Sequence, residues 1–294
     1  MSVDALASQL RAVLPGLSDA ESLRFACAAL AGPTFELPTE AQAQDGVPRG
    51  SLRELRQTSS ATYPGVSRTL RVYEPADKSG PYALIVFQDG ARYLGPEAQA
   101  ATVLDNLINL GALPPTVALF VEPGEEGPGL PIYGGPGNRS VEYDSIGPTY
   151  ARFLIEELIP VACEGLKLKQ DRQQRAIVGL SSGGHCAFNA AWERPDFFSK
   201  VLSHCGSFVN LRGGHLLASA VRMSDENKDL RVWLQTGERD LDIVFGNWPL
   251  ANRELASALA YRGYAHKLVV DPGGHSLAHG GAMLAESLCW LWKE

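Results

Sequence analysis

Two adjacent serines lie between glycines in the stretch Gly179-Leu180-Ser181-Ser182-Gly183. The stretch fits the G-x-S-x-G pattern, in which the central serine sits on a sharp turn from strand to helix and projects its hydroxyl above the sheet. Flanking glycines suit this turn because strand and helix approach too closely there for a Cβ atom. The pattern makes Ser181 a candidate nucleophile and the backbone N–H of Ser182 a candidate oxyanion donor. A chance tight turn in a Gly-rich chain is the alternative.

A serine hydroxyl is a weak nucleophile and needs a base, which in turn is usually oriented by an acid. In this architecture the acid follows the serine along the chain, at the end of a later strand. An apolar run at 230–237 leads into Glu238-Arg239-Asp240-Leu241-Asp242. Asp240 is the preferred acid because it falls just past the expected strand end, and Glu238 and Asp242 remain alternatives.

The base is expected last in the chain order. The apolar run at 266–271 leads into Pro272-Gly273-Gly274-His275, where two glycines let the loop bring an imidazole close to the serine. His275 is therefore the preferred base, with His279 as the alternative.

A second oxyanion donor is expected after an early strand. The apolar run at 83–88 is followed by Asp89-Gly90-Ala91, and Gly90 would let the backbone turn so that the N–H of Ala91 faces the site. An ordinary Asp-Gly turn would explain the same residues.

Four further residues are expected to bind substrate, because they lie in loops at the carboxyl ends of the strands. They are Tyr133, Arg139, Phe245 and Trp248. Aromatic groups and a guanidinium suit an aryl or sugar ester. Alternatively, Trp248, which precedes Pro249, packs the start of the next helix.

Short β-rich runs alternate with longer helical patterns from about residue 51 onward. The runs are continuously apolar, as expected for strands that are covered on both faces, so the pattern predicts an α/β protein with a mostly parallel sheet between helices. The expected strands are 70–75, 83–88, 116–123, 176–180, 200–206, 230–237 and 266–271, and the clearest helix candidates are 150–166 and 249–263.

Residues 1–50 read as a helical appendage and connector, and residues 51–294 as the catalytic domain. Two short helices are expected before residue 40, broken at Pro15, and the second opens with the capping-box spacing Ser18-x-x-Glu21. The Gly- and Pro-rich segment 123–140 is long for a loop within a domain, so we expect it to cover the site.

Composition excludes several classes of function. The formal charge is −7 over 294 residues, with no basic block, which argues against a nucleic-acid surface. The five cysteines form no CxxC pair and suit a reduced compartment. No apolar stretch approaches the ~20 residues of a membrane span, and no secretory signal pattern is visible. We therefore expect a cytoplasmic protein without a membrane or nucleic-acid partner; a homo-oligomer stays open.

The chain resembles the "putative esterase" family of α/β-hydrolases, which includes enterochelin, esterase D-like, feruloyl and acetyl-xylan esterases. The resemblance rests on the stretches at 87–94, 138–144, 179–198, 236–242 and 273–281. It implies an α/β-hydrolase fold with Ser181 as nucleophile, Asp240 as acid and His275 as base.

The sequence thus predicts a serine carboxylic-ester hydrolase that forms an acyl-enzyme on a small-molecule aryl, acetyl or sugar ester, without metal or cofactor. Three alternatives remain: a siderophore esterase, a non-catalytic binding protein with the same fold, and a metalloenzyme using His275 and His279. Acyl transfer by the same residues also stays open.

Overall fold

The computed structural model describes residues 1–293, which form one eight-stranded sheet and a separate two-stranded ribbon. The sheet order is β1-β2-β4-β3-β5-β6-β7-β10. The β1–β2 and β2–β4 pairs are antiparallel and all other neighbours are parallel. The strands are β1 Ser51–Gln57, β2 Arg68–Glu74, β3 Ala83–Gln88, β4 Thr116–Val121, β5 Arg175–Leu180, β6 Lys200–His204, β7 Arg231–Gly237, β10 Ala265–Asp271, and, in the ribbon, β8 Asp242–Ile243 and β9 Gly246–Asn247.

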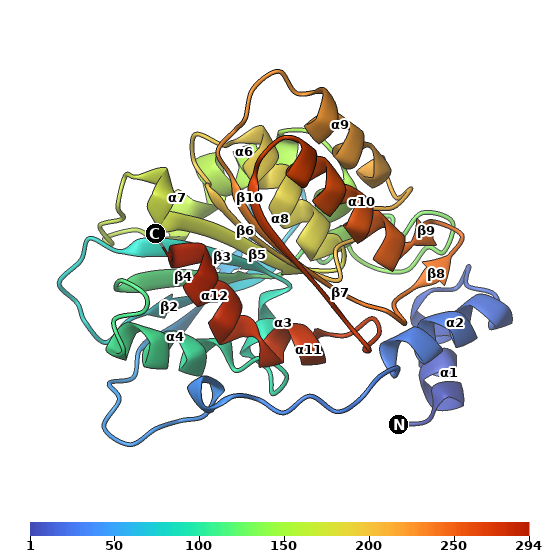
Figure 1. Cartoon of the computed structure of the whole chain (residues 1–294), viewed down its shortest axis with the longest axis horizontal. Coiled ribbons are helices and arrows are strands. Elements are labelled where there is room, and N and C mark those ends of the chain that lie inside the picture. The colour runs from blue at the N-terminus through green and yellow to red at the C-terminus, as the bar shows by residue number, and fades with distance from the viewer. Residues whose placement is uncertain (294) are drawn as a thin grey trace.

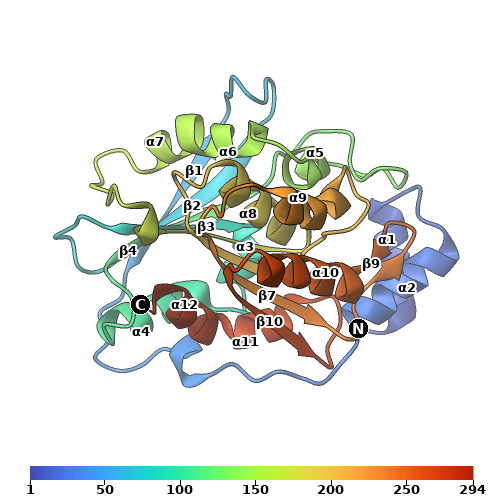
Figure 2. The ribbon, with the colours of Figure 1, turned by 45° about the horizontal axis from the view of Figure 1, so that its top comes forward.

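Helices cover both faces of the sheet (Figures 1 and 2). One layer holds α6 to α10 and the other α3, α4, α11 and α12, and each layer buries its own apolar cluster against the sheet. This confirms the predicted α/β fold. The helices are α1 Val3–Val13, α2 Asp19–Ala29, α3 Gly90–Leu94, α4 Ala100–Asn109, α5 Arg139–Asp144, α6 Thr149–Phe153, α7 Ile159–Ala162, α8 Ser182–Glu193, α9 Leu217–Met223, α10 Trp248–Tyr261, α11 Leu277–Ala282 and α12 Leu284–Trp292.

The central strands are the ones that the sequence predicts best. Every residue of β3, β4, β5 and β6 is buried. This agrees with the prediction of strands that helices cover on both faces. Strand β1 was not predicted: its sequence SLRELRQ is charged and largely exposed, and it pairs only with β2 at the edge of the sheet.

The single helix predicted at 150–166 is wrong in detail. The structure divides it into α6, a π-helical turn at Leu154–Leu158 and the short α7. Pro160 lies at the start of α7, where it removes one backbone N–H donor and crowds the preceding turn, and a widened π turn accommodates both effects.

Helices α1 and α2 pack beside the ribbon of β8 and β9 at the carboxyl end of the sheet (Figure 1). The hydroxyl of Ser18 caps α2 by accepting a hydrogen bond from the N–H of Glu21 at 3.3 Å. A segment with one short helical turn, Thr39–Ala41, then leads to β1. Within residues 1–293, no helix combines the length and the apolar character that crossing a membrane requires.

Candidate active site

Ser181 lies on the turn between β5 and α8 with φ 58° and ψ −122°. An L-residue adopts this conformation only where its surroundings enforce it. The backbone supplies that constraint: the N–H of Ser181 donates to the carbonyl of His204 at 2.8 Å, and its carbonyl accepts from Ser207 and His185, both at 3.0 Å. A Cβ atom on Gly179 would lie 2.0 Å from the carbonyl oxygen of Gly183, so the strand and helix could not approach as they do.

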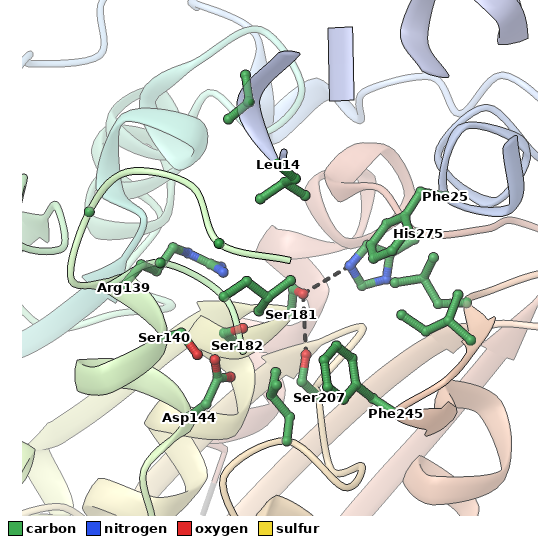
Figure 3. Close-up of a pocket in the computed structure, with 18 of the residues that line it drawn as sticks. Leu14, Phe25, Arg139, Ser140, Asp144, Ser181, Ser182, Ser207, Phe245 and His275 are labelled. Atoms are coloured by element: carbon green, nitrogen blue, oxygen red, sulfur yellow. Dashed lines mark hydrogen bonds between the residues drawn. The ribbon is translucent and has the colours of Figure 1, made fainter. Parts of the chain in front are cut away.

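The structure brings Ser181, His275 and Asp240 together. Nε2 of His275 lies 2.9 Å from the Oγ of Ser181, and Nδ1 lies 2.6 Å from Oδ1 of Asp240 (Figure 3 shows the serine contact). The imidazole thus bridges a hydroxyl and a carboxylate, which is the geometry that activates a serine.

Asp240 is held rigidly in this arrangement. Its side chain is fully buried, Oδ2 accepts from the hydroxyl of Thr236 at 2.9 Å, and Oδ1 also accepts from the N–H of Leu241 at 2.7 Å. The alternatives Glu238 and Asp242 are exposed. Of the three acidic candidates, Asp240 is the one that contacts the imidazole.

His279 belongs to a different pair. Its Nδ1 contacts Oδ2 of Asp271, and Phe35 stacks on its ring with centroids 4.3 Å apart. Burial would raise the pKa of Asp271, but hydrogen bonds from His279 and neighbouring donors lower it. Because His275 and His279 pair with separate carboxylates, the structure does not assemble the zinc pair considered from the sequence.

The loop that carries His275 rests on helix α2. The N–H of His275 donates to the carbonyl of Ala28 at 2.8 Å. A Cβ atom on Gly274 would lie 1.9 Å from the same carbonyl oxygen, so only glycine permits this approach. Helix α2 therefore supports the loop that carries His275.

A pocket of about 250 Å³ opens over Ser181. The predicted substrate-binding residues Arg139, Phe245 and Trp248 line it. Further lining comes from α1 and α2, the 129–137 segment, α5, the start of α8, the β6–β8 region and the loop after β10: Val13, Leu14, Phe25, Gly129, Leu130, Gly134, Pro136, Gly137, Ser140, Asp144, Ser182, Ser207, Leu211, Leu241, Ile243 and His275. Most of this lining is apolar, which suits an uncharged organic substituent.

Tyr133 does not line the pocket, so this prediction is wrong. Its ring is buried with edge contacts to Phe25 and Phe245, and its hydroxyl donates to Oε1 of Glu21 at 2.5 Å. The residue supports the pocket wall from behind and joins helix α2 to the 129–137 segment.

Ala91 does not supply an unoccupied oxyanion donor, which contradicts the sequence prediction. Its N–H donates to Oε1 of Glu122 at 2.5 Å, and Ala91 is not among the residues that line the pocket. Glu122 lies close to Ala91 because it directly follows β4, the strand that pairs with β3. Burial raises the pKa of this carboxyl, and the hydrogen bond from Ala91 opposes that shift.

Arg139 lines the pocket and contacts the carboxyl ends of β3 and β5. Its Nε and Nη2 donate to the two carboxylate oxygens of Asp89 at 2.8 and 2.6 Å, and Nη2 also reaches the carbonyl of Leu180 at 3.3 Å. In the part of the chain that the structure describes, Nη1 makes no hydrogen bond. Burial would lower the pKa of Arg139, but its pairing with Asp89 raises it, so the group stays charged.

The Gly- and Pro-rich segment predicted to cover the site does border the pocket, and its base is fixed. The carboxylate of Glu142 accepts from Gly124 at 3.2 Å and from the amide of Asn138 at 2.9 Å. The fully buried guanidinium of Arg68 pairs with the same carboxylate. Both ends of the loop are therefore tied to one buried ion pair.

Sequence reasoning missed Ser207 and Asp144 as residues of the site. The hydroxyl of Ser207 lies 3.2 Å from that of Ser181 and accepts from the indole N–H of Trp248 at 3.1 Å. Ser207 follows β6, an expected strand, so its place near the carboxyl edge was the available signal. Asp144 ends α5, a short helix with no apolar pattern to reveal which way it faces.

Comparisons with known proteins show the family of the chain. The model of the "Putative esterase" family matches residues 60–291. The chain belongs to this family. One relative of this esterase-family chain is an iron(III) enterobactin esterase of Dickeya dadantii (strain 3937), 24% identical over 229 residues that cover 73% of the chain and 46% of the relative. The chain thus spans about half the length of this curated relative.

Solved structures share the fold of this esterase-family chain. The enterobactin esterase FES of Shigella flexneri superimposes with a TM-score of 0.66 at 22% identity, covering 84% of this chain and 61% of that one. A ferulic acid esterase gives a TM-score of 0.64 at 18% identity, covering 83% and 98%. At these identities the structural likeness shows the α/β-hydrolase fold alone.

Proposed function

We propose that this chain is a serine carboxylic-ester hydrolase that works through Ser181, His275 and Asp240. The observation that carries the proposal is the single imidazole of His275, which contacts the serine hydroxyl with one nitrogen and the buried aspartate with the other. Membership of the esterase family supports the same reaction class.

In the first half of the reaction, the Oγ of Ser181 attacks the ester carbonyl while Nε2 of His275 takes its proton. Asp240 holds the imidazole and stabilises its positive charge. The tetrahedral intermediate collapses as His275 gives the proton to the leaving alcohol, which leaves an acyl group on Ser181. In the second half, His275 takes a proton from water, the resulting attack releases the acid, and Ser181 regains its proton.

The oxyanion needs donors on the side of Ser181 away from the leaving group. The N–H of Ser182 is well suited because it is the first N–H of α8, where the helix dipole favours negative charge. With the N–H of Ala91 donated to Glu122, the charged Arg139 takes the place of the second group, through its unbonded Nη1.

The pocket favours an aryl, acetyl or sugar ester over a siderophore complex. Its volume is about 250 Å³, and its cation, Arg139, is already paired with Asp89. An anionic multi-armed siderophore ester would need more room and more unpaired positive charge. The enterobactin esterase relative keeps that substrate class as the second candidate.

Hydrolysis of an ester panel tests the proposal. The panel includes 4-nitrophenyl acetate, methyl ferulate and an acetylated sugar, each assayed with the wild type, Ser181→Ala and Ser182→Ala. We expect turnover of at least one ester, its loss in Ser181→Ala, and its retention at a reduced rate in Ser182→Ala, which keeps the backbone donor. Equal turnover by Ser181→Ala and wild type, or no turnover of any ester by folded wild type, would contradict it.

A further inference from the structure

The pocket contains a buried acid that the proposed mechanism does not use. Asp144, the last residue of α5, is 1% exposed and lies among the lining residues (Figure 3). Among residues 1–293, neither of its carboxylate oxygens has a hydrogen-bond partner of ordinary geometry. A buried carboxylate without a donor is costly, so such a group in a pocket indicates a missing partner.

Polar and titratable groups surround the carboxyl of Asp144. Burial raises the pKa of the carboxyl, while the charge of nearby Arg139 and the flanking hydroxyls of Ser182 and Ser140 oppose the shift. Burial also lowers the pKa of His185, whose Nδ1 is engaged by the carbonyl of Tyr143. The imidazole is therefore not a cationic partner for Asp144 at neutral pH.

The charge of this corner favours a neutral donor over a cation. Arg139 pairs with Asp89, and Arg212 donates to the hydroxyl of Ser140 at 3.1 Å. Two guanidinium groups thus accompany the carboxylates of Asp89 and Asp144, and their formal charges cancel. An alkyl hydroxyl can donate to Asp144 without adding a third positive charge.

The position of Asp144 assigns the donor to one part of the substrate. The leaving oxygen must lie near Nε2 of His275, which protonates it. Asp144 lies beyond Ser182 and Ser140, on the other side of Ser181 from His275 (Figure 3). A group that reaches Asp144 therefore belongs to the acyl half of the ester.

We propose that Asp144 forms a hydroxyl-recognising subsite, so that the preferred substrates are esters of hydroxy-substituted acyl groups. The inference rests on the proposed esterase function and deepens it. The apolar side chains of Leu211, Ile243 and Phe245 line the same pocket as Asp144. Hydroxyl recognition by an otherwise unpaired buried acceptor gives strong discrimination, because an unsubstituted acyl group leaves that acceptor unpaired.

Matched pairs of 4-nitrophenyl esters test the subsite. The pairs are butyrate with 3-hydroxybutyrate and hexanoate with 6-hydroxyhexanoate, and the O-methyl ethers keep the size of the hydroxylated compounds but cannot donate. For at least one pair we expect the wild type to favour the hydroxyl compound about tenfold in kcat/KM over both its deoxy and its O-methyl counterparts. In Asp144→Asn the preference should fall to about twofold or less.

The matched control is Asp105→Asn, since the carboxylate of Asp105 accepts from Tyr73 and Gly50 outside the pocket. It should keep the wild-type preference. Hydrolysis without hydroxyl preference in any pair, measured on the wild type alone, overturns the subsite and leaves the esterase standing. A preference that persists in folded Asp144→Asn also overturns it. Failure to hydrolyse any ester overturns both proposals together.

Discussion

Two carboxylate–imidazole pairs lie side by side at the carboxyl edge of the sheet, Asp240–His275 and Asp271–His279. They use the same residue types, and their histidines are four positions apart. His275 reaches the hydroxyl of Ser181 and borders the pocket, whereas His279 is stacked on Phe35. The difference teaches that a carboxylate–imidazole pair does not by itself indicate a catalytic site. What matters is the group that the second imidazole nitrogen faces.

The largest expected effect separates the two imidazoles. His275→Ala should lower kcat/KM for the best ester by about 10⁴-fold, because it removes the imidazole that contacts the hydroxyl of Ser181. His279→Ala should stay within about tenfold of the wild type, since its ring holds the loop and touches no reacting atom. Steady-state kinetics on purified, folded variants measures both. Equal losses in the two variants would break the distinction.

Replacing each of the two carboxylates should be harmful, but one replacement should lower the rate and the other the stability. Asp240→Asn should lower kcat by about 10³ to 10⁴-fold, because the amide stabilises the wrong tautomer and not the imidazolium. Asp271→Asn should mainly lower the free energy of unfolding, by about 1–3 kcal/mol, as its carboxylate accepts from Gln235 and Gly273. Urea unfolding alongside the kinetics separates these effects. A larger loss of kcat in Asp271→Asn would contradict the assignment.

The sequence predicts some residues of the site better than others. Ser181, Asp240 and His275 each follow a continuous apolar run, so strand order alone indicates that they meet. Glu238 and Asp242 carry the same charge as Asp240, and only the path of the loop shows that they are exposed.

Residues whose position depends on contacts between distant segments could not be predicted. Tyr133 turns away from the pocket because Glu21, more than a hundred positions earlier, accepts its hydroxyl. The N–H of Ala91 is taken by Glu122 for the same kind of reason. In the fold, the charged edge strand β1 has no apolar period to reveal it.

A third histidine sharpens the comparison through pH. His204 lies close to His279, but its ring contacts the hydroxyl of Tyr93 at 2.9 Å and not a carboxylate, and burial lowers its pKa to about 3. The imidazole of His204 takes up a proton near pH 6.5 in the unfolded chain, but only near pH 3 in the folded chain. Stability is therefore full above about pH 6.5 and falls as the pH decreases between these values.

Replacing this imidazole should remove its share of the acid sensitivity. In His204→Gln, the free energy of unfolding should fall less steeply between pH 6 and 4, by about 1.4 kcal/mol per pH unit, as one proton fewer is bound on unfolding. Urea titrations at several pH values measure the slope. An unchanged slope in a folded variant would show that His204 does not remain neutral in the native protein.

The smallest expected effect concerns the aromatic neighbours of the two imidazoles. Phe25 lines the pocket that His275 also borders, whereas Phe35 stacks on His279. Phe25→Leu should change kcat/KM several-fold, and Phe35→Leu should lower the free energy of unfolding by about 1 kcal/mol with kcat/KM unchanged. Kinetics and thermal unfolding on both variants check this. A reversed pattern would mean that the pocket has been assigned to the wrong histidine.

The most direct test of the central claim is covalent labelling of the nucleophile. A fluorophosphonate probe reacts with an activated serine, and intact mass followed by peptide mapping locates the adduct. The account predicts one adduct on Ser181, which is absent in Ser181→Ala, forms far more slowly in His275→Ala, and forms at nearly the wild-type rate in His279→Ala. An unlabelled folded protein, an adduct on another serine, or labelling that survives His275→Ala unchanged would contradict it.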